Sequence, residues 1–265
     1  MKIKIIDSSI CESCRNKKCS FIGATENPNF YNIKTESTVC PTGLLVTGPT
    51  EEDLEAGEIR STKDVKCVNC CLCVKQCPHN NLKVEDYTYK TSDFTGLNEP
   101  QHNAIALSYL NNVFDFAANT NRNKALTFDG YIRTLTGKQC FVEVDHQNDS
   151  LESCRRIIGD IVSYNYQKDE RISDGLIVLN DIPKRGSRDV YILLEKIKKF
   201  PRTNHLSMYI ATFALLRYFN LYLKNGQYEL SDLMYNPNEE SEEEYINRIR
   251  ELVNSTDELA QIFEE

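Results

Sequence analysis

Four closely spaced cysteines, with a proline directly after the last, are the residues of this sequence best suited to chemistry. They follow the spacing C-x2-C-x2-C-x3-C-P and are Cys67, Cys70, Cys73 and Cys77. Three thiolates at this spacing can bind one [4Fe-4S] cluster from a single tight turn, while the fourth points toward a second cluster. Cys71 lies within the run. We interpret it as a packed thiol, because only Cys70 keeps two-residue gaps on both sides.

A stretched copy of this spacing precedes it. The copy has the form C-x2-C-x4-C followed by a later Cys-Pro pair, and its cysteines are Cys11, Cys14, Cys19 and Cys40. Both halves therefore contain three close thiols and a Cys-Pro, as in an internal repeat. Pairs of the type C-x2-C also bind zinc, so two structural zinc sites are the alternative. The repeated Cys-Pro and the three-plus-one arrangement favour iron-sulfur clusters.

On these motifs, residues 1–95 resemble the bacterial-type ferredoxins that bind two [4Fe-4S] clusters. The resemblance implies an α+β ferredoxin-like iron-sulfur module whose two halves exchange their fourth ligands. The implied ligands of the first cluster are Cys11, Cys14, Cys19 and Cys77. The implied ligands of the second cluster are Cys67, Cys70, Cys73 and Cys40. Residues 48–66, which are rich in Glu, Gly and Thr, are expected to form a polar hairpin or loop between the halves.

Three acidic residues among apolar neighbours form a second candidate site. Asp129 lies on one expected strand, and Glu143 and Asp145 lie on the next. Residues two apart on a strand project from the same face, so Glu143 and Asp145 share a face. Clustered carboxylates repel one another unless a cation is bound, and their hard oxygens suit Mg²⁺ or Mn²⁺. Such an ion can activate water and stabilise charge on a phosphate, whereas the alternative is a set of acids on an exposed sheet face.

The elements that would position these acids follow from hydrophobic periodicity. A first group consists of a helix over 104–118, strands over 125–134 and 139–146 joined by a turn at 136–138, and a helix over 150–166. A second group consists of a strand over 175–179, a helix over 190–200 and a strand over 206–213. Residues 215–223 fit strand or helix equally, and 237–265 are expected to form an acidic terminal helix.

This element order and the spacing Asp-x13-Glu-x-Asp resemble the PD-(D/E)xK nuclease superfamily. The resemblance implies an α/β restriction-endonuclease-like domain over residues 96–236 that acts on DNA or RNA. Its implied catalytic and metal-binding residues are Asp129, Glu143 and Asp145. Asp145 departs from the pattern, because it stands where the superfamily usually has lysine. Either Lys138, Arg155 or Arg156 takes the part of that lysine or no residue does, and Glu99 is a candidate additional acid.

Charge and hydropathy limit the partners of the chain. The formal net charge is -8, and residues 237–265 carry all of it, with 2 Lys/Arg against 10 Asp/Glu. Residues 1–236 are neutral overall, so net charge neither supports nor excludes nucleic acid as a partner. No apolar run approaches the roughly 18 residues that a membrane span needs, so no membrane is expected. Clusters need reduced thiols, which predicts a cytoplasmic location.

Two functions from different classes follow from these features. The first is an iron-sulfur protein with two [4Fe-4S] clusters and a divalent-metal-dependent nuclease domain. The alternative is an electron-transfer ferredoxin protein whose second domain is a non-catalytic module. Such a module would dock a redox partner or another subunit of a complex.

Overall fold

In a computed structural model of the chain, the contacts between residues divide it into two compact units, Met1–Ser108 and Tyr109–Glu265. The structure describes residues 2–16, 40–42, 44–45, 48–61, 67–86, 94, 96–114, 116–118, 127–145, 149–168, 172–180, 188–198, 206–223 and 226–253. The division falls within helix α4 (Glu99–Val113), whereas the sequence placed a boundary near residue 95. Among the described helices, none is long and apolar enough to cross a membrane.

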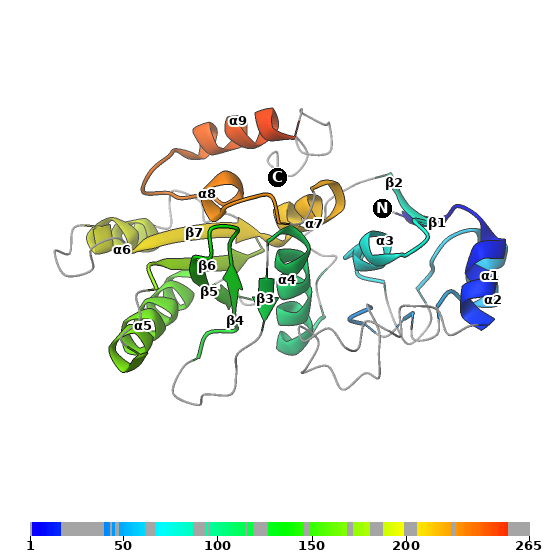
Figure 1. The fold of residues 1–265 in the computed structure, drawn as a ribbon, viewed down its shortest axis with the longest axis horizontal. Coiled ribbons are helices and arrows are strands. Elements are labelled where there is room, and N and C mark those ends of the chain that lie inside the picture. The colour runs from blue at the N-terminus through cyan, green and yellow to red at the C-terminus, as the bar shows by residue number, and fades with distance from the viewer. Residues whose placement is uncertain are drawn as a thin grey trace. The chain divides into compact units, whose positions relative to one another are not determined.

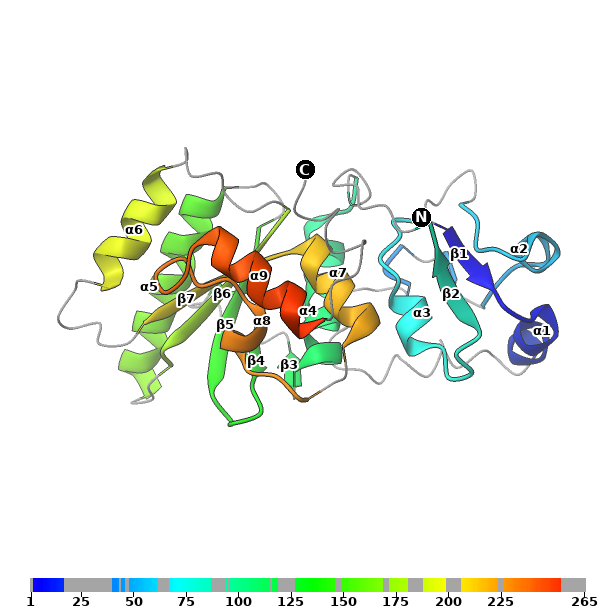
Figure 2. The same cartoon turned by 90° about the horizontal axis from the view of Figure 1, so that it is seen from above.

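The first unit contains a two-stranded antiparallel sheet of β1 (Lys2–Ile5) and β2 (Leu82–Glu85). Ile3 and Ile5 are buried on one face of this sheet, as the two-residue period of a strand requires. Helix α1 (Ser8–Asn16) follows β1, and helix α3 (Leu72–Gln76) precedes β2 and contacts it (Figure 2). Pairing of the two strands therefore brings two distant cysteine-bearing segments, α1 and the end of α3, to the same end of the sheet.

Helix α2 (Glu51–Ala56) corrects the expectation of a polar hairpin or loop over residues 48–66, of which 62–66 lie outside the described residues. Thr50 accepts a hydrogen bond from the Asp53 backbone at 3.1 Å, and the Asp53 carboxylate accepts one from the Thr50 backbone at 2.9 Å. This reciprocal pair is a capping box, which satisfies two backbone donors that a helix start leaves without partners. Gly57 then ends the helix with a φ of 66°, a left-handed conformation that glycine adopts without strain.

The second unit is a mixed α/β fold around a five-stranded sheet. The sheet order is β3-β4-β5-β6-β7, and the strands are Phe116–Ala118, Gly130–Arg133, Gln139–Val144, Asp174–Leu179 and Ser207–Thr212. The first three strands pair antiparallel, and β5, β6 and β7 pair parallel. The expected parts of elements at 125–126, 146 and 199–200 lie outside the described residues.

The structure corrects one expected helix and decides one open choice between strand and helix. The helix expected over 104–118 ends at Val113, and Phe116–Ala118 forms β3 against β4. Residues 215–223, left open between strand and helix, belong to helix α7 (Phe213–Tyr222), which Thr212 caps by accepting from the Leu215 backbone. Every residue from Phe213 to Asn220 is buried, so this segment has no solvent-exposed face, and its period is hard to read from hydrophobicity.

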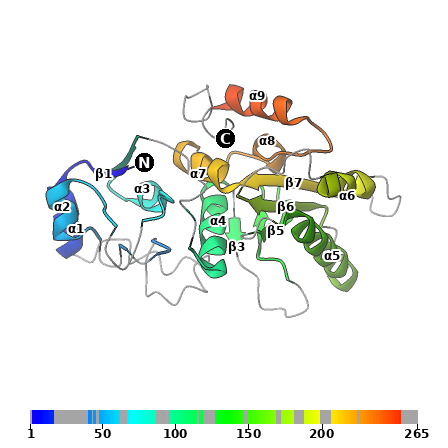
Figure 3. The ribbon, with the colours of Figure 1, turned by 180° about the vertical axis from the view of Figure 1, so that it is seen from behind.

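Helices cover the sheet on both sides. Helices α5 (Ser150–Lys168) and α6 (Arg188–Lys198) connect the parallel strands and contact each other. Figures 1 and 3 show α5 on one side of β7 and α9 (Glu242–Leu252) on the other. All six residues of β6 are buried, as expected for a parallel strand covered on both faces.

Gly175 on β6 sets how closely α5 approaches the sheet. A Cβ atom at Gly175 would lie 2.8 Å from Met208 Sδ and 3.2 Å from Ile157 Cδ1 of α5. The absence of a side chain therefore lets α5 pack directly over β6. This close packing sets the distance between α5 and the neighbouring strand β5, which α5 also contacts.

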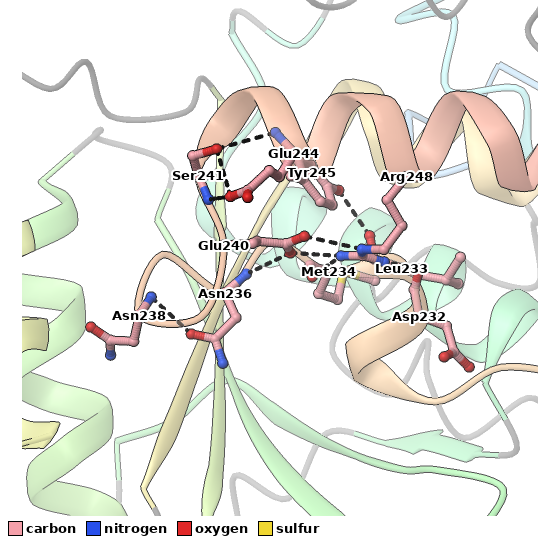
Figure 4. Close-up of polar contacts among 10 residues, drawn as sticks. All are labelled: Asp232, Leu233, Met234, Asn236, Asn238, Glu240, Ser241, Glu244, Tyr245 and Arg248. Atoms are coloured by element: carbon pink, nitrogen blue, oxygen red, sulfur yellow. Dashed lines mark hydrogen bonds and ion pairs between the residues drawn. The ribbon is translucent and has the colours of Figure 1, made fainter.

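Helix α9 is the described part of the acidic helix expected over 237–265, since residues 254–265 lie outside the described residues. It is held to the unit by Arg248 (Figure 4). Arg248 donates from Nε to Glu240 Oε2 at 3.0 Å and from Nη2 to Glu240 Oε1 at 2.7 Å. The same guanidinium donates to two backbone carbonyls at the end of helix α8 (Leu230–Leu233). They belong to Asp232, within α8, and to Met234, directly after it. Tyr245 and Ile249 of α9 are fully buried, so the helix is an integral part of the unit.

We expect Arg248→Met to lower the free energy of unfolding of the second unit by about 2 kcal/mol. The reason is that the variant keeps the aliphatic stem and loses the charge-assisted hydrogen bonds. Urea unfolding followed by circular dichroism measures the change, and Arg250→Met on the last turn of α9 is the matched control. Equal unfolding midpoints for wild type and Arg248→Met would show that this network adds nothing.

Candidate metal centres

The described thiols of the first unit lie in two groups. The first group joins Cys11 and Cys14 of α1 with Cys77, which follows α3. Burial raises the pKa of the Cys11 thiol, a hydrogen bond from Asn81 opposes that rise, and the charges of Cys77 and Cys14 add to it. Cys77 and Cys14 act on Cys11 because they lie near it. Cys19 lies outside the described residues.

The second group brings together Cys40, Cys67, Cys70 and Cys73. Burial raises the pKa of Cys70 and of Cys73 well above the ordinary value, and the charges of Cys40 and Cys67 raise both further. Asn69 and Cys71 have φ angles of 51° and 59°, and these left-handed residues fold the segment into a tight turn. The turn directs thiols separated by two residues toward one region.

Cys71 has a different environment from the cysteines beside it. Its side chain is fully buried, and its Sγ donates to the Asn69 carbonyl oxygen at 3.2 Å. Its charge would nevertheless raise the pKa of both Cys70 and Cys73, so it lies close to the second group. A protonated Cys71 avoids this repulsion and keeps its hydrogen bond to the backbone.

The three acids of the second unit are buried around the end of β5. Asp129, Glu143 and Asp145 are 5%, 1% and 5% exposed, so the alternative of an exposed sheet face is wrong. Asp129 directly precedes β4, and its Oδ2 accepts a hydrogen bond from the Val144 backbone at 2.7 Å. This bond fixes the Asp129 carboxylate beside β5 and next to Glu143.

Glu143 is the electrostatic centre of this cluster. The pKa of Glu143 is raised to about 8, and burial is the largest cause. The negative charge of Asp129 raises it further, and the positive charge of Arg156 opposes the rise. The charges of Asp160 and Asp145 make smaller contributions in the same direction as Asp129. Arg156 Nη1 lies 2.9 Å from Glu143 Oε1. Glu143 Oε2 is buried and has no hydrogen-bond partner among the described residues. A buried carboxylate oxygen in this state is stabilised by a proton or by a bound cation.

Of the three basic residues considered in place of the usual lysine, Arg156 is the one that contacts the acids. Arg155 pairs with Glu152 at 3.9 Å on the exposed side of α5. Lys138 acts on Asp174, whose pKa burial raises and Lys138 lowers, and Asp174 is the first residue of β6. Glu99, the candidate additional acid, is exposed at the first residue of α4.

Asp160 belongs to the cluster and was missed from the sequence. It lies four residues after Arg156 on α5 and is 7% exposed. Its Oδ2 accepts hydrogen bonds from the Thr127 backbone at 2.8 Å and the Thr127 hydroxyl at 3.0 Å. The available signal was its position in the apolar stripe of α5, between Ile157 and Ile161. An acid in such a stripe is buried, and burial of an acid marks a candidate site.

The described residues contain no group of three or more His, Cys, Asp or Glu side chains arranged around a single metal ion. The chemistry of the donors nevertheless fits the expected groups, since buried thiols suit iron and buried carboxylates suit a hard divalent cation. The cysteines of each group would therefore have to turn their thiols toward one point to hold a cluster, and Asp129, Glu143 and Asp145 would have to do the same with their carboxylates to hold an ion.

Comparisons of the chain with protein-family models, with curated proteins and with solved structures find no match. The similarities to dicluster ferredoxins and to PD-(D/E)xK nucleases therefore stay predictions from motifs.

Glu143 should make the stability of the second unit depend on pH. Its pKa of about 8 in the folded state exceeds the ordinary 4.5, so between these values the folded protein binds more protons than the unfolded chain. The free energy of unfolding must then fall as pH rises through this window, by at most about 1.4 kcal/mol per pH unit. Glutamine does not titrate, so the stability of wild type relative to Glu143→Gln should decline by about 3 kcal/mol from pH 5 to pH 8.

Urea unfolding of both proteins at several pH values, without added divalent cation, measures this difference. Glu152→Gln, at an exposed position of α5, is the matched control and should run parallel to wild type. Parallel curves for wild type and Glu143→Gln would contradict the assignment of a raised pKa to Glu143.

Proposed function

We propose that this chain is an iron-sulfur protein that binds two [4Fe-4S] clusters and carries a divalent-metal-dependent nuclease site. The observation that carries the first part is the grouping of the thiols across the sequence repeat. Cys77 of the later half lies near Cys11, and Cys40 of the earlier half lies near Cys70 and Cys73. Exchange of the fourth ligand between halves is what the ferredoxin resemblance implies.

Charge compensation supports the binding of clusters at these thiols. Cys70 and Cys73 are buried, and ionising them together brings negative charges close in a region of low dielectric. Iron ions would neutralise the thiolates and remove this penalty. When bound, the clusters would supply one-electron redox chemistry or structural support.

The nuclease part of the proposal rests on Glu143, whose Oε2 atom is buried without a hydrogen-bond partner among the described residues. Mg²⁺ or Mn²⁺ held by Asp129, Glu143 and Asp145 would satisfy the buried Oε2 atom of Glu143 and reduce the repulsion among the acids. Such an ion would supply an activated water and stabilise charge on a phosphodiester. Arg156 is 43% exposed, so its guanidinium contacts both Glu143 and the solvent from which a nucleic acid phosphate would arrive.

Iron analysis after anaerobic reconstitution tests the cluster assignment. The wild type should bind about eight irons, and Cys70→Ser should lose about four because one cluster loses a ligand. Cys154→Ser is a matched control, since Cys154 is a buried thiol of the second unit. Zinc in place of iron, or equal iron in wild type and Cys70→Ser, would contradict the proposed ligands.

Cleavage of single- and double-stranded DNA and RNA with Mg²⁺ or Mn²⁺ tests the nuclease assignment. Glu143→Gln should lower the rate by about 10²-fold or more while the iron content is unchanged, because the ion loses a ligand. Mn²⁺ should also raise the melting temperature of wild type, and Glu143→Gln should abolish this rise. Glu152→Gln should match wild type in both measurements. Cleavage that persists in Glu143→Gln would place the chemistry elsewhere.

Electron transfer with a non-catalytic second unit is the second candidate function. The observation that favours it is the ion pair of Arg156 with Glu143 at 2.9 Å, which gives this carboxyl group a partner without a divalent ion. It predicts reversible reduction of the clusters and electron delivery to an acceptor protein, with no response of the melting temperature to Mn²⁺. Clusters that can be reduced only by unfolding the protein would count against it.

A further inference from the structure

Asn81, between α3 and β2, is 3% exposed and joins the two halves of the first thiol group. Its backbone N–H donates to Cys77 Sγ at 3.3 Å, and its backbone carbonyl accepts from Ile6 at 3.0 Å. Its side-chain Nδ2 donates to Cys11 Sγ at 3.1 Å. One residue therefore provides N–H donors to two thiols that are 66 positions apart in the sequence.

The orientation of the Asn81 amide is fixed by the Asp7 backbone. The Asp7 N–H donates to Asn81 Oδ1 at 3.0 Å, and the Asp7 carbonyl accepts from Asn81 Nδ2 at 2.8 Å. A flipped amide would bring nitrogen against the Asp7 N–H and oxygen against the Asp7 carbonyl, and both contacts would be lost. The second hydrogen of Nδ2 is thus committed to Cys11, and the sulfur receives a donor.

A donor at this position favours negative charge on the Cys11 sulfur. Hydrogen bonds to cluster sulfurs are one of the means by which a protein sets the reduction potential of an iron-sulfur cluster. The reduced cluster carries one more negative charge than the oxidised cluster, so N–H donors stabilise the reduced state and raise the potential. Burial of Asn81 strengthens this effect because no water competes for the amide.

We propose that Asn81 is a positioning residue that orients Cys11 and Cys77 toward one cluster and raises the reduction potential of that cluster through its side-chain N–H. The inference rests on the proposed binding of two clusters and adds a determinant of potential that the cysteine spacing does not contain. It also assigns different control to the two clusters, since Asn81 contacts thiols of the first group.

Potentiometric titration monitored by electron paramagnetic resonance tests this assignment on the full, anaerobically reconstituted chain. Asn81→Asp keeps an oxygen for the Asp7 N–H, loses both side-chain donor hydrogens and adds a negative charge. One of the two midpoint potentials should fall so that the ratio of reduced to oxidised cluster changes at least tenfold at a fixed potential, which is about 59 mV for one electron. The other midpoint potential should not move.

Two further variants make the result specific. Asn81→Ala removes the donors without adding charge and should lower the same midpoint potential by a smaller amount. Asn98→Asp is the matched control, because Asn98 is exposed in the same unit and its Oδ1 accepts from the Gln101 backbone at 3.0 Å, which aspartate retains. Both potentials of Asn98→Asp should equal those of wild type.

Iron content measured on the same samples separates the outcomes. Unchanged potentials in both Asn81 variants, with about eight irons retained, would overturn the role of Asn81 and leave cluster binding intact. If Asn81→Asp loses a cluster, the midpoint potentials and iron content of Asn81→Ala decide whether Asn81 sets the potential. A lowered potential in Asn81→Ala supports the inference, whereas wild-type potentials or the same loss of iron would make Asn81 purely structural. A wild type that binds no iron would overturn the proposed function itself.

Discussion

Both units bury acidic groups beside one another, thiols in the first unit and carboxyl groups in the second. The free energy that it costs to ionise these groups is the constraint that the surrounding contacts must meet. One unit of pKa shift corresponds to about 1.4 kcal/mol of difference between the charged and neutral forms. The pKa of Glu143 rises from 4.5 to about 8, so at neutral pH this side chain is neutral unless a cation replaces the proton. The thiols of Cys70 and Cys73 face the same penalty in the first unit, where burial is the largest cause of their raised pKa.

Each unit offsets this cost with hydrogen-bond donors or cations that lie close to the acidic groups. Packing and hydrogen bonds of the backbone hold these donors and cations in place. In the second unit, the Val144 N–H fixes Asp129, and the approach of α5 over Gly175 brings Arg156 and Asp160 to Glu143. In the first unit, the pairing of β1 with β2 brings Asp7 to Asn81. The polar groups at each site are therefore positioned by contacts between segments distant in sequence, which makes both sites properties of the whole unit.

Local patterns predicted the parts of this arrangement that local physics controls. Cysteine spacing named the thiols as candidate ligands, which stays a prediction. The acids were expected on neighbouring strands, and Asp129 directly precedes β4, Glu143 lies on β5 and Asp145 directly follows it. Helix α2 was missed because the composition of residues 48–66 suggested a loop, although Thr50 and Asp53 have the spacing of a capping box. Strand β3 was missed because its apolar residues continue the helical pattern of α4, and only pairing with β4 distinguishes them.

The contacts that no local pattern contains are those between distant residues. Asn81 and Cys11 are 70 positions apart, and a single asparagine carries no motif. Asp160 reaches Glu143 from another element, so its role depends on how α5 packs on β5. These residues act by contact across the fold, and their functions follow once the packing is known.

In the proposed nuclease site, Arg156 would supply the cation that a strand motif with an aspartate in place of lysine lacks. What phosphate chemistry requires is a cation near the acids, and the guanidinium of Arg156 supplies one from a helix, 2.9 Å from Glu143 Oε1. Without metal, the charge of Arg156 opposes the rise in the pKa of Glu143 but leaves that pKa at about 8. A divalent ion at Glu143 would take over the interaction with the carboxylate, and the Arg156 side chain, already 43% exposed, would then be available to a phosphate group. In the proposed nuclease site, exchange of the partner of Glu143 from arginine to metal would couple ion binding to the recognition of an anionic substrate.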